Sequence, residues 1–131
     1  MEKQLRNILC IDDDEDIVEV AKTSFEALSN FTAHGAIGGQ EGIKRAEELK
    51  PDLILLDVMM PGMDGLATLK ILRENPIFSQ TPIIFMTARV QSSDISYYKT
   101  LGVAGVIAKP FDPEVLVREV ENFWRSFHEK Q

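Results

Sequence analysis

Four short apolar runs of this chain are followed by polar residues that could do chemistry together. Apolar runs rich in Ile, Leu and Val are typical of strands buried on both faces, as in a parallel sheet. Ligands of an open parallel sheet bind beyond the carboxyl ends of its strands. We therefore expect the polar residues to meet at one edge of a sheet. The runs are NILCI before Asp12 and Asp13, DLILL before Asp57, PIIFM before Thr87, and GVIA before Lys109.

Three carboxylates at one sheet edge favour a divalent cation. Two unit charges about 4 Å apart repel by about 4 kcal/mol at an effective dielectric constant of about 20. A fold tolerates this repulsion if a cation lies between the acids or if they take up protons. Mg²⁺ binds a few carboxylates, keeps several waters and accepts phosphate oxygens. The sequence has no His or Cys cluster that would suit a softer metal. Asp12, Asp13 and Asp57 thus predict a Mg²⁺ site.

Asp57 also has the setting of a nucleophile, because a loop containing Pro and Gly follows its strand. A carboxylate in this position can form an aspartyl phosphate. Lys109 would offset the charge of the phosphoryl group, and the Thr87 hydroxyl could donate to one of its oxygens. Taken singly, an acid after a strand is often the N-cap of the next helix. The ordered set of acids, hydroxyl and amine favours a functional site.

The elements that must position these residues alternate along the chain. Strands that alternate with helical patterns indicate a parallel sheet with helices on both faces, an α/β fold. Pro51 and Pro76 end two of the helices, Gly102 closes a third, and Asp112 caps the last one with Pro113 at its first position. The predicted strands include residues 53–57 and 104–108, and the first helix covers about residues 14–29.

Size and composition limit the classes of function. A chain of 131 residues suits one domain. Its 14 basic and 21 acidic residues give a net charge of −7, which disfavours direct binding of nucleic acid or of an anionic membrane. Cys10 is the single cysteine, so no internal disulfide is possible. No apolar run is long enough for a membrane helix or a signal peptide, and we expect a cytoplasmic protein.

Four motifs of the chain resemble the receiver domain of two-component response regulators, the family of the chemotaxis receivers. The resemblance covers about residues 6–125 and implies a flavodoxin-like (βα)5 fold with strand order 2-1-3-4-5, here a single domain over residues 1–131. We expect a stand-alone regulator, although a piece of a longer chain remains the alternative. The motifs are ILCIDDDEDI, DLILLDVMMPGMDG, PIIFMTA and GVAGVIAKPF.

The resemblance also implies a function. The phosphoacceptor Asp57 would take a phosphoryl group from a phosphohistidine of a sensor histidine kinase or a phosphotransfer protein. The domain would be a signalling module that catalyses only its own phosphotransfer and autodephosphorylation. A face formed by the fourth helix, fifth strand and last helix would then bind a downstream protein. Further implied roles are Mg²⁺ binding by Asp12, Asp13, Asp57 and the Met59 carbonyl, a switch hydroxyl on Thr87, a phosphate partner in Lys109, and a cis Lys109–Pro110 bond.

One position departs from the family pattern. Val106 stands where many receivers carry an aromatic ring that swings inward on activation, and Val cannot make this movement. The signal could instead pass through residues 88–94 or through Tyr97 and Tyr98, although we expect both tyrosines on the helix surface. Arg89 either pairs with the phosphoryl group or lies in solvent. Trp124 and Phe127 are expected to pack in the core or on the face of the last helix, which in this family is also a common partner surface.

Two other functions use the same residues. A Mg²⁺-dependent phosphatase with an aspartyl-phosphate intermediate would need a general acid, usually an Asp two positions after the nucleophile, where this chain has Met59. A phosphate-independent interaction module would be indicated by loss of an acid, Thr or Lys from the site, and none is lost. Both alternatives are therefore disfavoured.

Overall fold

The computed structural model describes residues 4–129 as five strands, five α-helices and a short 3₁₀ helix. The strands pair in parallel in the order β2-β1-β3-β4-β5, which confirms the predicted fold class and topology. The strands are β1 Asn7–Asp12, β2 Thr32–Ile37, β3 Leu53–Asp57, β4 Ile83–Thr87 and β5 Gly105–Ala108. The helices are α1 Glu15–Leu28, α2 Gly39–Leu49, α3 Gly65–Glu74, α4 Ser92–Thr100 and α5 Pro113–Glu129, with η1 at Pro76–Phe78.

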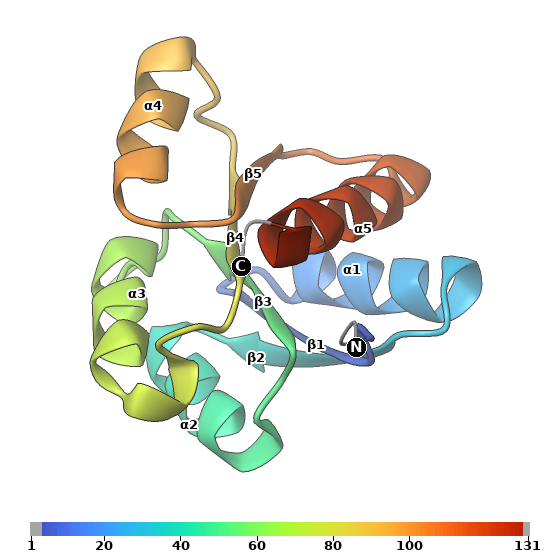
Figure 1. The fold of residues 1–131 in the computed structure, drawn as a ribbon, viewed down its shortest axis with the longest axis horizontal. Helices are drawn as coiled ribbons and strands as arrows, with labels where there is room; N and C mark the ends of the chain where they lie inside the picture. The colour runs from blue at the N-terminus through green and yellow to red at the C-terminus, as the bar shows by residue number, and fades with distance from the viewer. Residues whose placement is uncertain (1–3, 130–131) are drawn as a thin grey trace.

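The helices cover the sheet in two layers, α1 and α5 on one face and α2, α3 and α4 on the other (Figure 1). Every residue of β3 and of β4 is buried, because successive side chains of a strand point to opposite faces and both faces are covered. Two separate apolar cores result, and they meet only through the sheet. Among the described residues, no helix has the length and apolar character needed to span a membrane.

Short-range signals fix several helix ends, and those at Gly102 and at Asp112 with Pro113 are as the sequence predicts. The carboxylate of Asp14 caps α1 by accepting from the Asp16 N–H. Helix α5 begins at Pro113, and the Asp112 carboxylate accepts from the Glu114 N–H at 2.9 Å. Gly102 follows α4 with a φ of 83°, a backbone conformation that favours glycine. The caps of α1 and α5 set where these helices leave the carboxyl edge of the sheet, and Gly102 turns the chain from α4 toward the start of β5.

The placement of Tyr98 corrects the sequence-based expectation for α4. Tyr97 lies on the helix surface with 52% of its area exposed, as predicted, but Tyr98 is only 5% exposed. The Tyr98 ring packs edge-on against Phe85 of β4, with 5.3 Å between the ring centroids. The neighbour of Phe85 on β5 is Val106, which has a short side chain. Tyr98 therefore packs on a ring that lies beside Val106 in the sheet. Trp124 is buried in the core shared by α1 and α5, as expected.

Candidate phosphoryl and metal site

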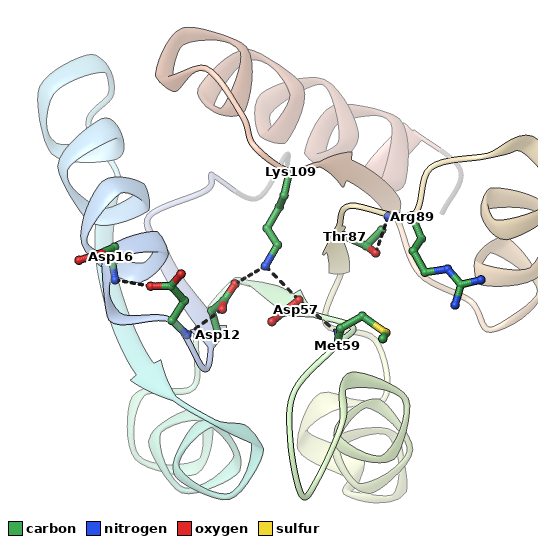
Figure 2. A network of polar contacts seen from close by, with 8 residues as sticks. Asp12, Asp16, Asp57, Met59, Thr87, Arg89 and Lys109 are labelled. Carbon is green, nitrogen blue, oxygen red and sulfur yellow. Dashed lines mark hydrogen bonds and ion pairs between the residues drawn. The ribbon is translucent and has the colours of Figure 1, made fainter.

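The polar residues predicted to converge do meet at the carboxyl edge of the sheet (Figure 2). Asp12, Asp57 and Thr87 are the last residues of β1, β3 and β4, and Lys109 directly follows β5. The Lys109 ammonium nitrogen lies 3.0 Å from Asp12 Oδ2 and 3.1 Å from Asp57 Oδ1. One amine therefore bridges two carboxylates that come from different strands.

The acidic side of the site has the donor set of a hard cation. Carboxylate oxygens of Asp12, Asp13 and Asp57 all lie within 4.8 Å of one another. Asp12 and Asp57 are buried, whereas Asp13 is exposed. Three oxygen donors with one open side fit Mg²⁺, which keeps part of its water shell. The same oxygens would suit a soft metal poorly, since such metals prefer sulfur and imidazole ligands.

The charges of the site perturb the titration of its buried groups. Burial, followed by the charge of Asp12, raises the pKa of Asp57 to about 7, although the Lys109 ammonium opposes this rise. Burial alone would lower the pKa of Lys109, but its hydrogen bonds and charge interactions with Asp12 and Asp57 outweigh burial and raise it. The ammonium is thus held in its charged form, while Asp57 changes charge near neutral pH.

Backbone groups hold the acids in place. The Asp14 N–H donates to Asp12 Oδ1 at 2.9 Å, and the Met59 N–H donates to Asp57 Oδ1 at 3.3 Å. Met59 is exposed beside Asp57. The predicted role of its carbonyl oxygen as a metal ligand stays a prediction.

Gly65 is a positioning residue that the sequence analysis did not single out. A Cβ at this first residue of α3 would collide with the backbone carbonyl of Asp57 and with Val58. Only glycine allows α3 to begin so close to the end of β3. The Pro and Gly punctuation of the loop signals a turn there, but no sequence pattern shows which glycine touches the strand.

The hydroxyl side of the site continues into the β4–α4 connection. Thr87 is buried, and its Oγ accepts from the Arg89 N–H at 3.0 Å. The Arg89 side chain points toward α4, where its guanidinium lies 4.0 Å from Asp94 (Figure 2). The Arg89 side chain is 65% exposed, in agreement with the alternative that it lies in solvent, and Asp94 is a neighbour that the sequence did not indicate. The Lys109–Pro110 peptide bond is cis, as the resemblance implies.

A family comparison agrees with this geometry. The model of the response regulator receiver domain matches residues 8–121. The chain belongs to the response regulator receiver family. Receivers of this family are signalling modules of two-component systems that interact with histidine kinases, and they typically bind Mg²⁺ at an acidic pocket.

Similar proteins are response regulators. The chain is 36% identical over 120 residues to PhoP, the alkaline phosphatase synthesis transcriptional regulatory protein of Bacillus subtilis, covering 92% of this chain and 49% of PhoP. It is 35% identical over 121 residues to the DNA-binding response regulator MtrA of Mycobacterium tuberculosis, covering 92% of this chain and 51% of MtrA. The receiver therefore spans about half the length of these relatives.

Solved receivers share the whole architecture. The chemotaxis protein CheY4 of Vibrio cholerae superposes with a TM-score of 0.84 at 26% identity, over 92% of this chain and 99% of CheY4. A receiver domain of a histidine kinase from Syntrophus aciditrophicus gives a TM-score of 0.78 at 27% identity, over 92% of this chain and 91% of that one. The fold is thus that of a CheY-like receiver.

Proposed function

We propose that Asp57 is the phosphoacceptor of this receiver and takes its phosphoryl group from a phosphohistidine of a sensor histidine kinase or a phosphotransfer protein. The observation that carries the proposal is the Lys109 ammonium, which hydrogen-bonds Asp12 and Asp57 at the same time. This amine places a positive charge beside the carboxylate that would gain a doubly negative group.

The transfer needs one nucleophile and little other covalent chemistry. An Asp57 carboxylate oxygen bonds to phosphorus, the phosphorus–nitrogen bond of the phosphohistidine breaks, and its electron pair stays on the imidazole nitrogen. Lys109 offsets the negative charge of the phosphoryl oxygens, and the Thr87 hydroxyl donates to one of them. Catalysis in this site is positioning and charge stabilisation.

The metal in this proposal is Mg²⁺. Asp12, Asp13, Asp57 and the backbone carbonyl of Met59 would hold it. When bound, Mg²⁺ supplies neutralising charge between the acids and the phosphoryl oxygens. The close carboxylate oxygens support this assignment, because a cation relieves their mutual repulsion. The pKa of Asp57, raised by burial and then by the charge of Asp12, agrees with a site that lacks a compensating charge.

The output surface in this proposal is the α4–β5–α5 face. A groove of about 550 Å³ lies there, with apolar walls from Ile95 of α4, Val106 of β5 and Phe123 of α5. Lys99 and Ser126 also line the groove, and a concave surface of such mixed polarity suits a protein segment. The net charge of −7 supports protein contact over direct contact with nucleic acid or a membrane. We propose that a downstream protein binds this face in one phosphorylation state of Asp57.

Acetyl phosphate with Mg²⁺, followed by intact-mass measurement, tests the proposed acceptor. The wild-type receiver should gain one phosphoryl group, whereas Asp57→Asn should gain none. Asp16→Asn is the matched control, since it removes an exposed acid of α1 and should leave the mass gain unchanged. Folded wild-type protein without a mass gain would overturn the proposal.

The same sample separates the alternative functions. The exposed Met59 thioether cannot donate a proton as a general acid, so we expect only slow hydrolysis of the Asp57 phosphoryl group and no repeated turnover of phosphomonoesters. Sustained phosphate release from such esters would instead support a phosphatase. Partner binding that Asp57→Asn leaves unchanged under phosphorylating conditions would support a phosphate-independent module.

A further inference from the structure

We infer that Arg89 couples the state of Asp57 to helix α4 by moving its guanidinium from Asp94 to the phosphoryl group. This inference rests on the proposed phosphoacceptor function of Asp57. Val106 has no aromatic ring that could move on activation. In this inference, the signal passes instead through the β4–α4 connection.

The backbone of Arg89 contacts Thr87 of the phosphoryl site, and its side chain contacts Asp94 of α4. Its backbone N–H donates to the Thr87 hydroxyl oxygen at 3.0 Å, so its main chain is attached to the phosphoryl site. Its Nη2 lies 4.0 Å from Asp94 Oδ1, so its side chain is attached to the first turn of α4. Figure 2 shows the Arg89 side chain directed away from Asp57. The residue therefore links the two elements directly.

Helix α4 has few other attachments at this end. Its N-cap residue, Gln91, makes no side-chain capping hydrogen bond, and Tyr98 is the one buried residue of its nine. Asp94 adds to the stability of the first turn through its charge near the helix N-terminus and its contact with Arg89. Tyr98 packs on Phe85 near the other end of α4, so the helix would turn about this buried contact when its first turn moves.

The charges favour an exchange when Asp57 is phosphorylated. Arg89 is 65% exposed and Asp94 21%, and a solvent-screened pair of this kind is weak. A phosphoryl group carries nearly two negative charges and three acceptor oxygens, which a guanidinium binds with directed hydrogen bonds. Because the Thr87 hydroxyl turns toward the same group, the backbone of Arg89 moves with it. Asp94 then loses its partner and the first turn of α4 loosens.

Reciprocal linkage makes this exchange measurable. If the phosphoryl group and Asp94 compete for one guanidinium, removing Asp94 must strengthen binding at Asp57. Beryllofluoride with Mg²⁺ serves as the phosphoryl probe, titrated against amide NMR shifts of the site. Asp94→Asn should raise the affinity about two- to fivefold, the range for an exposed pair. Arg89→Gln should lower the affinity, and adding Asp94→Asn to Arg89→Gln should change nothing further.

Hydrogen exchange of α4 provides the second readout. Beryllofluoride should speed amide exchange at residues 92–95 in the wild type by a few fold, and Asp94→Asn should show fast exchange already without the probe. Glu114→Gln is the matched control, because Glu114 occupies the first turn of α5. Lys70→Gln removes an exposed cation of α3. Both controls should behave as the wild type.

The outcomes separate this inference from the function on which it rests. Wild-type protein that fails to bind beryllofluoride overturns the phosphoacceptor proposal and the coupling with it. Binding that Asp94→Asn and Arg89→Gln leave unchanged overturns the coupling alone. An affinity gain in Asp94→Asn that persists in the Arg89→Gln background also overturns it, because Asp94 would then act without Arg89.

Discussion

At the scale of single residues, the site is defined by a shortage of positive charge. Burial, and then the charge of Asp12, raises the pKa of Asp57 to about 7, because the one ammonium of Lys109 faces two buried carboxylates and does not offset both effects. The lysine itself stays charged. The resting site therefore favours uptake of a proton or a cation at neutral pH.

Replacing Asp57 should stabilise the fold in alkaline solution. Asp57 has a higher pKa in the folded chain, about 7 against 3.8, so the folded state binds more protons between these values and its stability falls as the pH rises through them. Asp57→Asn removes this effect. We expect its free energy of unfolding at pH 8 to exceed that of the wild type by about 2–4 kcal/mol, and by less than half as much at pH 5. Urea unfolding at both pH values measures the difference.

Asp16→Asn is the control for this experiment, since Asp16 is an exposed acid outside the cluster. It should show no such gain on going from pH 5 to pH 8. An Asp57→Asn variant that is less stable than the wild type at pH 8 would contradict the charge argument.

Replacing Lys109 should have the opposite effect. Lys109→Met leaves Asp12 and Asp57 without their shared ammonium, and uncompensated buried charge costs about 3 kcal/mol or more. We expect a loss of about 2–4 kcal/mol at pH 8, measured by urea unfolding without Mg²⁺. The loss should shrink at pH 5, where Asp57 takes up a proton. Lys70→Met, on the exposed surface of α3, should cost little, and an equal loss in both variants would argue against a specific role.

At the scale of elements, α4 is the least firmly attached helix around the site. Its one buried side chain, Tyr98, packs on Phe85 of the sheet, and Asp94 in its first turn lies 4.0 Å from the Arg89 guanidinium. A helix attached at one buried point can change its position without disrupting either core.

Truncating Tyr98 should therefore loosen α4. Tyr98→Ala removes a buried ring and should cost about 3–5 kcal/mol, whereas Tyr98→Phe keeps the ring and should cost about 1 kcal/mol or less. Tyr97→Ala, at the exposed neighbour, should stay within about 1 kcal/mol of the wild type. Thermal unfolding ranks the three variants. A large loss in Tyr97→Ala with none in Tyr98→Ala would restore the surface placement that the sequence suggested for Tyr98.

The sequence predicts the sheet and the site better than it predicts α4. The apolar runs of β1, β3 and β4 are unambiguous, and parallel strands must end at one edge, so the convergence of Asp12, Asp57 and Thr87 follows from pattern alone. Helix α4 is short and only weakly amphipathic, so the helical spacing of Ile95, Tyr98 and Leu101 is too weak a signal to place Tyr98 against the sheet. The Arg89–Asp94 contact crosses the end of a loop, where no periodicity applies.

At the scale of the whole molecule, the two helical layers meet only through the sheet, and the site lies at the sheet edge between them. A cation bound there contacts the ends of β1 and β3 together and should stabilise the molecule as a unit. Because the cation binds only the folded state, it should raise the free energy of unfolding by about 2.7 kcal/mol when its free concentration is about 100 times its dissociation constant.

Mg²⁺ should accordingly raise the melting temperature at pH 8, and raise it less at pH 5.5, where a proton on Asp57 competes with the cation. Asp13→Asn should abolish most of this effect without disturbing the buried Lys109 contacts, because Asp13 is the exposed acid of the cluster. Calorimetry of both proteins with and without Mg²⁺ provides the measurement. A stabilisation by Mg²⁺ that is equal in both would place the cation elsewhere.

The bridge made by Lys109 has a consequence for synthesis of the chain. Its two acidic partners emerge from the ribosome long before it, since 97 residues separate Asp12 from Lys109. Until the end of β5 has been translated and docked, Asp57 faces another acid with no ammonium beside it. If Asp57 is the phosphoacceptor, as proposed, we expect a chain that ends before Lys109 to accept a phosphoryl group poorly, so that phosphorylation would report completed folding.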